Sequence, residues 1–170
     1  MEVNKATTDV SRTPLFQACQ DSHLEIVEKL LERNDVEVNK ARNDGVTPLY
    51  MACSNGHLEI VEKFLQRSEI AVNNANDNGS TPLFIACQKG HLEIVQKLLK
   101  QNEINVNKIS KGTHTALTTA SSRGHLEIVQ ALLEHTGTDI RCCVELAIQK
   151  ASKKGHEDIV NLLRQNVGYV

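Results

Sequence analysis

Aromatic residues are scarce in this sequence: they make up 3% of its 170 residues, and tryptophan is absent. A hydrophobic core must therefore be built from Leu, Ile, Val and Ala, which suits closely packed helices. No apolar run approaches the roughly 20 residues that a helix needs to cross a bilayer. The first ten residues, MEVNKATTDV, have neither the basic start nor the apolar stretch of a secretory signal. We therefore expect no membrane partner.

The sequence also lacks a large excess of either charge, because it has 19 basic and 21 acidic residues and a formal net charge of −2. Nucleic-acid-binding domains usually carry a strong positive excess, so the composition gives no support for a nucleic-acid partner. The sequence contains no G-x-S-x-G, no Walker phosphate-binding loop and no G-x-G-x-x-G. We predict that the chain is not an enzyme and needs no cofactor.

What the sequence does contain is a repeat of 34 residues, marked by three separate motifs. A Thr-Pro-Leu motif begins at Thr13, Thr47 and Thr81, with a weaker copy at Thr115. His-Leu-Glu-Ile-Val begins at His23, His57, His91 and His125, and a degenerate copy begins 31 residues later at His156. Val-Asn recurs at Val38, Val72 and Val106. Three motifs with one period indicate a repeat protein.

Each repeat predicts a pair of helices. Thr before Pro is a favourable N-cap, and Pro loses no hydrogen bond at the first helical position. In the third repeat we predict a first helix from Pro82 to about Lys89 and a second over roughly 92–100, with Leu98 and Leu99 directed inward. The alternation Ile-x-Val-Asn that follows predicts a short extended arm, and an Asn-Asp-Gly or Asp-Asn-Gly turn returns the chain.

The combined pattern T-P-L-x-x-A-C-x-x-G-H-L-E-I-V-x-x-L-L-x…V-N resembles the ankyrin repeat family over about residues 9–166. The resemblance implies an all-α repeat solenoid, in which stacked antiparallel helix pairs are joined by β-hairpin-like loops whose tips project from one edge. We expect a single domain over 1–170. Its repeats should span approximately 9–41, 42–75, 76–109, 110–140 and 141–166, and residues 2–6 are interpreted as the remnant of an upstream repeat of a longer protein.

The sequence departs from the family pattern in two informative ways. The His that usually follows T-P-L is replaced by Phe16, Tyr50 and Phe84, so any side-chain hydrogen bond it made is expected to be lost to packing. The fifth repeat lacks T-P-L altogether, and its first helix is expected to begin near Arg141 and to run to about Lys153.

The five cysteines are an odd number, and without a secretory signal the expected state is free thiols in a reducing compartment. We therefore expect an intracellular location, cytoplasmic or nuclear. Cys19, Cys53 and Cys87 are equivalent, and repeats stack about 10 Å apart, too far for disulfides. We predict small buried residues there rather than a metal or redox site. In the pair Cys142-Cys143, one thiol should face outward from a helix, and a reactive or palmitoylated thiol remains open.

Two other constellations have structural interpretations. One His per repeat occupies the Gly-His turn, and residues so far apart cannot share one metal ion. Asn39, Asn73 and Asn107 each follow a Leu by eight residues, which resembles the context that asparagine β-hydroxylases recognise in some ankyrin proteins. The alternative is that each Asn side chain ties down its own hairpin turn.

The family resemblance implies a protein–protein interaction module that binds a partner protein or peptide through its concave face and hairpin tips. Two alternatives remain open: a structural or regulatory spacer within a larger multidomain protein, and a microbial effector that acts on a host protein. We expect a monomer that binds no metal.

The residues just before each Gly-His turn should end the first helix on the concave side. These pairs are Gln20-Asp21, Ser54-Asn55, Gln88-Lys89, Ser122-Arg123 and Lys153-Lys154. Positive charge in these pairs therefore increases toward the last repeats. One explanation is random variation on a solvent-exposed face. The other is a partner with an acidic segment that lies against repeats three to five, with tip residues setting the register of that segment. The candidate partner-binding residues are Arg42, Asn43, Asn55, Asp77, Asn78, Lys89, Lys111, Arg123, Lys153 and Lys154.

Overall fold

The computed structural model describes residues 3–7, 11–139, 141 and 143–168. The helices in this part of the chain are α1 (Pro14–Gln20), α2 (Leu24–Leu31), α3 (Pro48–Asn55), α4 (Leu58–Leu65), α5 (Pro82–Lys89), α6 (Leu92–Leu99), α7 (Ala116–Arg123), α8 (Leu126–Glu134), α9 (Val144–Lys153) and α10 (Glu157–Asn166).

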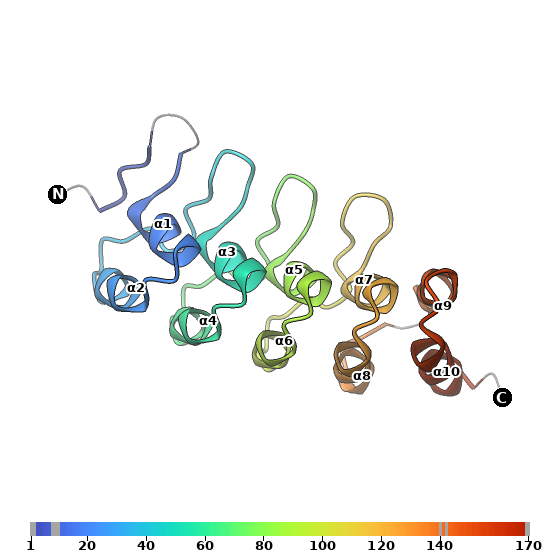
Figure 1. Cartoon of the computed structure of the whole chain (residues 1–170). Coiled ribbons are helices and arrows are strands. Elements are labelled where there is room, and N and C mark those ends of the chain that lie inside the picture. The colour runs from blue at the N-terminus through green and yellow to red at the C-terminus, as the bar shows by residue number, and fades with distance from the viewer. Residues whose placement is uncertain (1–2, 8–10, 140, 142, 169–170) are drawn as a thin grey trace.

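The helices form pairs that stack along one axis (Figure 1). Each odd-numbered helix packs against the next odd-numbered helix, and each even-numbered helix packs against the next even-numbered one. The molecule therefore has two rows of helices, with loops that project beside the odd-numbered row (Figure 1). The predicted all-α solenoid of stacked helix pairs is confirmed.

Threonine caps start the first helix of four repeats. The hydroxyl oxygens of Thr13, Thr47 and Thr81 accept hydrogen bonds from the backbone N–H three residues later, each at 3.1 Å. No Pro follows Thr115. The start of this helix has a reciprocal bond instead, in which the Thr115 N–H donates to the hydroxyl oxygen of Thr118 at 2.9 Å. This capping box satisfies two backbone groups that the helix start would leave unpaired.

The turn within each pair needs a left-handed residue. Gly56, Gly90 and Gly124 take φ values of 79°, 84° and 80° at the ends of α3, α5 and α7. The first repeat has Ser22 at the equivalent position, with φ 61°. Serine adopts this region at some cost, since its Cβ crowds the backbone. The first turn is therefore the most strained of the set.

The core runs through the whole stack rather than forming one centre. Equivalent isoleucines show why: Ile60, Ile94, Ile128 and Ile159 are between 1% and 2% exposed, whereas Ile26 in α2 is 49% exposed. The helices α4, α6, α8 and α10 each pack against the preceding even-numbered helix, whereas α2 has no such neighbour before it among the described residues. Leu98 is fully buried as predicted, whereas Leu99 is only partly buried at the edge of the core.

The prediction of an extended arm after the second helix is wrong. Val72 and Asn73 are the central residues of a tight turn, closed by the Asn74 N–H bonding to the Ala71 oxygen at 3.1 Å. The turn buries the Val side chain and directs the Asn side chain to the next repeat. The burial of Val and the bond of Asn to the next repeat favour this turn over the extended backbone that the alternating pattern suggested.

The projecting loops are hairpin-like, and no named β-strand occurs in the described ranges. Their bases are closed by backbone bonds from Arg42 to Val46 at 2.9 Å, from Asn76 to Ser80 at 3.0 Å and from Ser110 to His114 at 2.9 Å. We call the segments 42–46, 76–80 and 110–114 the tip loops.

The fifth repeat begins its first helix at Val144, three residues later than the expected Arg141. Cys143 occupies the N-cap position, so its predicted place on a helix is wrong, and Cys142 lies outside the described residues. Cys143 is buried, and its thiol donates to the backbone oxygen of Asp139 at 3.6 Å. This thiol therefore links Asp139 to the start of α9.

Candidate functional site

The odd-numbered helices end side by side, next to the tip loops. We call these helix ends and the tip loops together the inner surface. It contains the candidate residues predicted from the sequence, and the repeat stacking brings their elements into one row (Figure 1).

Four of the predicted cations stand free on the inner surface. Lys89, Arg123, Lys153 and Lys154 are exposed at the ends of α5, α7 and α9. Across the described ranges of the chain, no side-chain hydrogen bond or ion pair engages them. Exposed and unpaired cations are available to an external anion without first breaking an internal contact.

Asn55 has a structural partner instead. Its side-chain amide donates to the backbone oxygen of Gln20, at the end of α1, at 3.1 Å. This bond satisfies one of the carbonyl groups that a helix end leaves open. Asn55 is still exposed, so it adds a polar edge to the inner surface while linking the first two repeats.

Arg42 is also held within the protein. Its guanidinium lies 5.4 Å from the centre of the Phe16 ring and bonds both carboxylate oxygens of Asp44, at 2.9 and 2.5 Å. The bond from Arg42 is the main reason that the pKa of Asp44 lies below its ordinary value. Arg42 therefore fixes the first tip loop and offers little free charge, a difference that sequence spacing could not reveal.

The tip loops are bonded to one another, which sequence reasoning missed. The Asp77 N–H donates to the Asp44 oxygen at 3.0 Å, and the Lys111 N–H donates to the Asn78 oxygen at 2.8 Å. The Lys111 ammonium also donates to the Asn78 side-chain oxygen at 3.1 Å. Asn43, next to Asp44, is exposed at the same edge. The tips thus form a continuous ledge.

A hollow of about 160 Å³ lies where α5, α7, α9 and the base of the third tip loop meet. Its lining includes Gln88, His114, Arg123 and Lys150. Burial first, and the charge of Lys150 second, lower the pKa of His114 from 6.5. Only Arg123 of these was among the predicted binding residues. His114 and Lys150 fall outside the repeated motifs, so only the packing of three helices brings them together.

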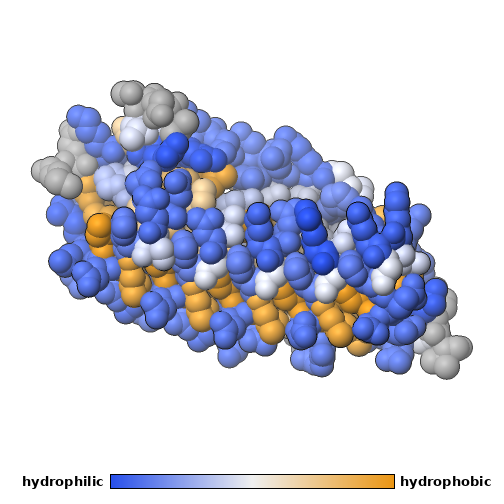
Figure 2. Space-filling model, in the orientation of Figure 1, coloured by the Kyte–Doolittle hydropathy of each residue, from blue (hydrophilic) through white to orange (hydrophobic). Residues whose placement is uncertain are grey.

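Hydrophilic residues dominate the face seen in Figure 2, and apolar side chains surface there only in short columns along the stack. Among the described residues, the exposed large hydrophobic side chains are Ile26 and Ile109. The face seen in Figure 2 therefore does not offer a partner a broad apolar contact surface.

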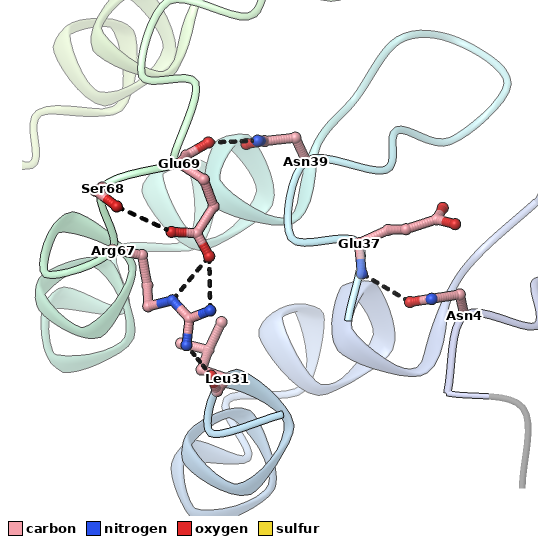
Figure 3. A network of polar contacts seen from close by, with 7 residues as sticks. All are labelled: Asn4, Leu31, Glu37, Asn39, Arg67, Ser68 and Glu69. Atoms are coloured by element: carbon pink, nitrogen blue, oxygen red, sulfur yellow. Dashed lines mark hydrogen bonds and ion pairs between the residues drawn. The ribbon is translucent and has the colours of Figure 1, made fainter. Parts of the chain in front are cut away.

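The asparagines of the Val-Asn motif make a ladder between repeats. The Asn39 amide donates to the Glu69 oxygen at 2.8 Å, and its oxygen accepts from the Ala71 N–H at 2.9 Å. Beside it, Arg67 bonds the Glu69 carboxylate and the backbone oxygen of Leu31, at the end of α2 (Figure 3). The prediction that each Asn ties down its own hairpin is thus wrong, because it bonds the following repeat.

A comparison of the sequence with known protein families agrees with this periodic architecture. The model described as "Ankyrin repeats (3 copies)" matches residues 2–74, 55–143 and 105–169, which together span nearly the whole chain. The chain belongs to the ankyrin repeat family. Ankyrin repeats are generally protein–protein interaction modules and are not typically enzymes. No curated protein matches the sequence.

Within this ankyrin stack the repeated cysteines are part of the core. Cys19, Cys53 and Cys87 are free thiols and fully buried, as predicted, and burial raises the pKa of each above its ordinary value. Because the thiolate is the reactive form, all three should be inert in the native protein.

One of the repeated histidines and one of the aromatic replacements make polar contacts with a neighbouring repeat. Nε2 of His91 lies 3.2 Å from the Ser54 oxygen of the preceding repeat. Tyr50, at the position where ankyrin repeats usually have His, accepts a bond from the Asn76 amide at 3.4 Å, so the expected loss of polar contact is only partial there.

Two further properties of the described residues concern metal binding and membrane insertion. No cluster of three or more His, Cys, Asp or Glu side chains suited to a metal ion occurs among them. None of the helices in those ranges combines the length and apolar character needed to cross a bilayer.

Proposed function

We propose that this ankyrin stack binds a partner protein that carries an acidic segment, along the inner surface of repeats three to five. The observation that carries the proposal is the set of exposed cations at three consecutive helix ends: Lys89, Arg123, Lys153 and Lys154.

A contrast with the outer row supports this choice of surface. On the even-numbered helices, Lys63 pairs with Glu28 at 2.7 Å and Lys97 pairs with Glu62 at 2.6 Å. Those lysines link neighbouring repeats, and their charge is compensated. In repeats three to five the exposed cations Lys89, Arg123, Lys153 and Lys154 therefore add positive charge to the inner surface, although the chain as a whole has a net charge of −2.

The tip ledge is expected to set the register of the bound segment. Asn43, Asp77 and Asn78 present polar groups at its edge, and Lys111 adds a cation to the ledge, where it bonds Asn78. Because the tips are bonded to one another, they need little ordering on binding, which favours affinity. Arg42 contributes by holding the first tip loop in place.

Charge complementarity of this kind acts mainly on association rate and specificity, and salt screens it. We therefore expect the affinity for the partner to fall as ionic strength rises from about 0.05 to about 0.5 M. A partner held by apolar contacts would show little change or the opposite.

The test begins with cross-linking capture and mass spectrometry to obtain a partner. Its affinity is then measured for a triple variant, Lys89→Glu, Arg123→Glu and Lys153→Glu, against a control with the same charge change. Lys29, Lys100 and Arg164 suit the control because they are exposed on the outer row or just beyond it. Lys63 and Lys97 are unsuitable, since reversing either would break a bond between repeats.

We expect the inner triple to weaken binding by about two orders of magnitude or more and the control to stay within about three-fold, because only contacting charges couple strongly. Equal affinities for the two variants would overturn the proposal. A chain that captures no partner at all would favour the role of a spacer.

A further inference from the structure

The hollow between α5, α7 and α9 lies on the inner surface. Gln88 comes from α5, Ser122 and Arg123 from the last turn of α7, and Lys150 from α9, while Phe84 and Thr118 also line it. Phe84 and Thr118 are buried, so the floor is fixed by the core and the polar groups stand around it. Its volume of about 160 Å³ is several times the roughly 30 Å³ that one water molecule occupies in the liquid.

The lining contains two cations and no carboxylate. Arg123 brings a planar set of N–H donors, Lys150 brings an ammonium, and the amide of Gln88 adds a neutral donor. Hydroxyl groups of Thr119 and Ser122 complete the set. Within the described part of the chain, no side-chain hydrogen bond or ion pair occupies Arg123, Lys150 or Ser122. The hollow therefore holds several donors that converge without an internal acceptor.

His114 also lines the hollow and lies under the influence of Lys150. It lies at the base of the third tip loop, where its backbone oxygen accepts a bond from Ser110. The charge of Lys150 is one of the two causes that lower its pKa, so the ammonium acts directly on this corner of the hollow. Because the other lining residues bear no acidic group, nothing within the lining offsets this charge.

We propose that this hollow binds the carboxylate side chain of a Glu or Asp residue in the partner's acidic segment, with Arg123 and Lys150 as its counter-ions. The inference rests on the proposed function and adds the residues that read the segment. A carboxylate suits the site, because the fork of Arg123 matches its two oxygens and such charge-assisted bonds are the strong ones. Lys150 was not recognised from the sequence as a binding residue, and the hollow assigns it this role.

The site can be tested before the natural partner is known, with a fluorescein-labelled hexaglutamate peptide as the probe and hexaglutamine as its neutral counterpart. The hollow variant is Arg123→Gln with Lys150→Gln. Its matched control is Lys29→Gln with Lys100→Gln, which removes the same charge from exposed positions on the outer row or just beyond it. Thermal unfolding of both variants verifies that they are folded.

We expect the hollow variant to bind hexaglutamate about ten-fold or more weakly than the unmodified chain, and the control to lose no more than about three-fold. The NMR signal of the His114 imidazole gives a second measurement. Hexaglutamate should raise the pKa of His114 in the unmodified chain and in the control, because a bound carboxylate offsets Lys150. It should leave that pKa unchanged in the hollow variant.

Three outcomes would contradict the inference. If the hollow variant binds hexaglutamate as tightly as the control does and His114 does not respond, although the unmodified chain prefers hexaglutamate to hexaglutamine, acidic segments bind without using the hollow, so the proposed function stands and this inference fails. If the unmodified chain binds hexaglutamate no better than hexaglutamine, both fail. If a phosphoserine peptide of the same length binds more tightly and shifts His114 further, the choice of a carboxylate is wrong.

Discussion

The side-chain amide of Asn73 donates to the backbone oxygen of Glu103 at 2.6 Å, and the same side chain accepts from the Asn105 N–H at 2.8 Å. One asparagine therefore satisfies two backbone groups of the following repeat. Asn4, Asn39 and Asn107 make the same pair of bonds. The ladder fixes the distance between successive repeats at the loop side of the stack.

Asn73→Ala should lower the free energy of unfolding by about 1–3 kcal/mol, since two backbone groups lose their partner. Asn74→Ala is the matched control, because the exposed side chain of Asn74 makes no hydrogen bond within the described residues. That change should stay within about 0.5 kcal/mol. Urea unfolding followed by circular dichroism measures both. Equal losses would mean that the ladder does not contribute to stability.

Two equivalent isoleucines separate the effect of stacking from that of the helix itself. Ile94→Ala should cost about 2–5 kcal/mol, because its side chain is 2% exposed against the preceding repeat. Ile26→Ala should cost less than about 1 kcal/mol, since that side chain is 49% exposed. Similar losses of unfolding free energy in the two variants would contradict nearest-neighbour stacking.

The pKa of His114 should rise toward its ordinary value in the variant Lys150→Gln, because the variant removes one of the two causes that lower it. Lys153→Gln, on the same helix but exposed, should leave that pKa unchanged. Titration of the imidazole signals by NMR measures both. An unchanged pKa in Lys150→Gln would place the ammonium away from His114 in solution.

The same lowered pKa gives a direction for stability. The unfolded chain binds the proton of His114 more readily than the folded chain, so stability should decline as the pH falls from about 6.5 toward the lower folded pKa. This loss should be smaller in His114→Gln, which cannot be protonated. A steeper decline in that variant would contradict the assignment.

Cys19, Cys53 and Cys87 should resist thiol reagents in the native protein, because burial both blocks access and raises the pKa of each thiol. At about pH 8 a maleimide should leave the three unmodified, and it should modify all of them in denaturant. Mass spectrometry of the peptides identifies the modified positions. Rapid native modification of any of the three would show that its repeat opens locally.

The periodic features were predictable because each motif has a local cause. A Thr cap, a Pro at the first position and a left-handed Gly define the short helix from Pro82 to Lys89 without reference to the rest of the chain. The same is true of the buried Cys positions, which recur at the repeat period. The fold and the core therefore followed from spacing and residue type.

What the sequence could not provide depends on contacts between repeats. Asn39 looks like a residue of its own turn, and only the position of Glu69 shows that it bonds the next repeat. Arg42 looks like a free tip charge until Phe16 and Asp44 are seen beside it. Lys150 lies in a degenerate repeat, and the hollow that contains it exists only because α9 packs against α7.

The most direct test of the binding surface is hydrogen exchange of the chain with and without the captured partner. The inner-surface account predicts slower exchange at the ends of α5 and α7, in α9 and in residues 110–114, with α6, α8 and α10 unchanged. Protection confined to α6, α8 and α10, with the inner surface unaffected, would contradict it.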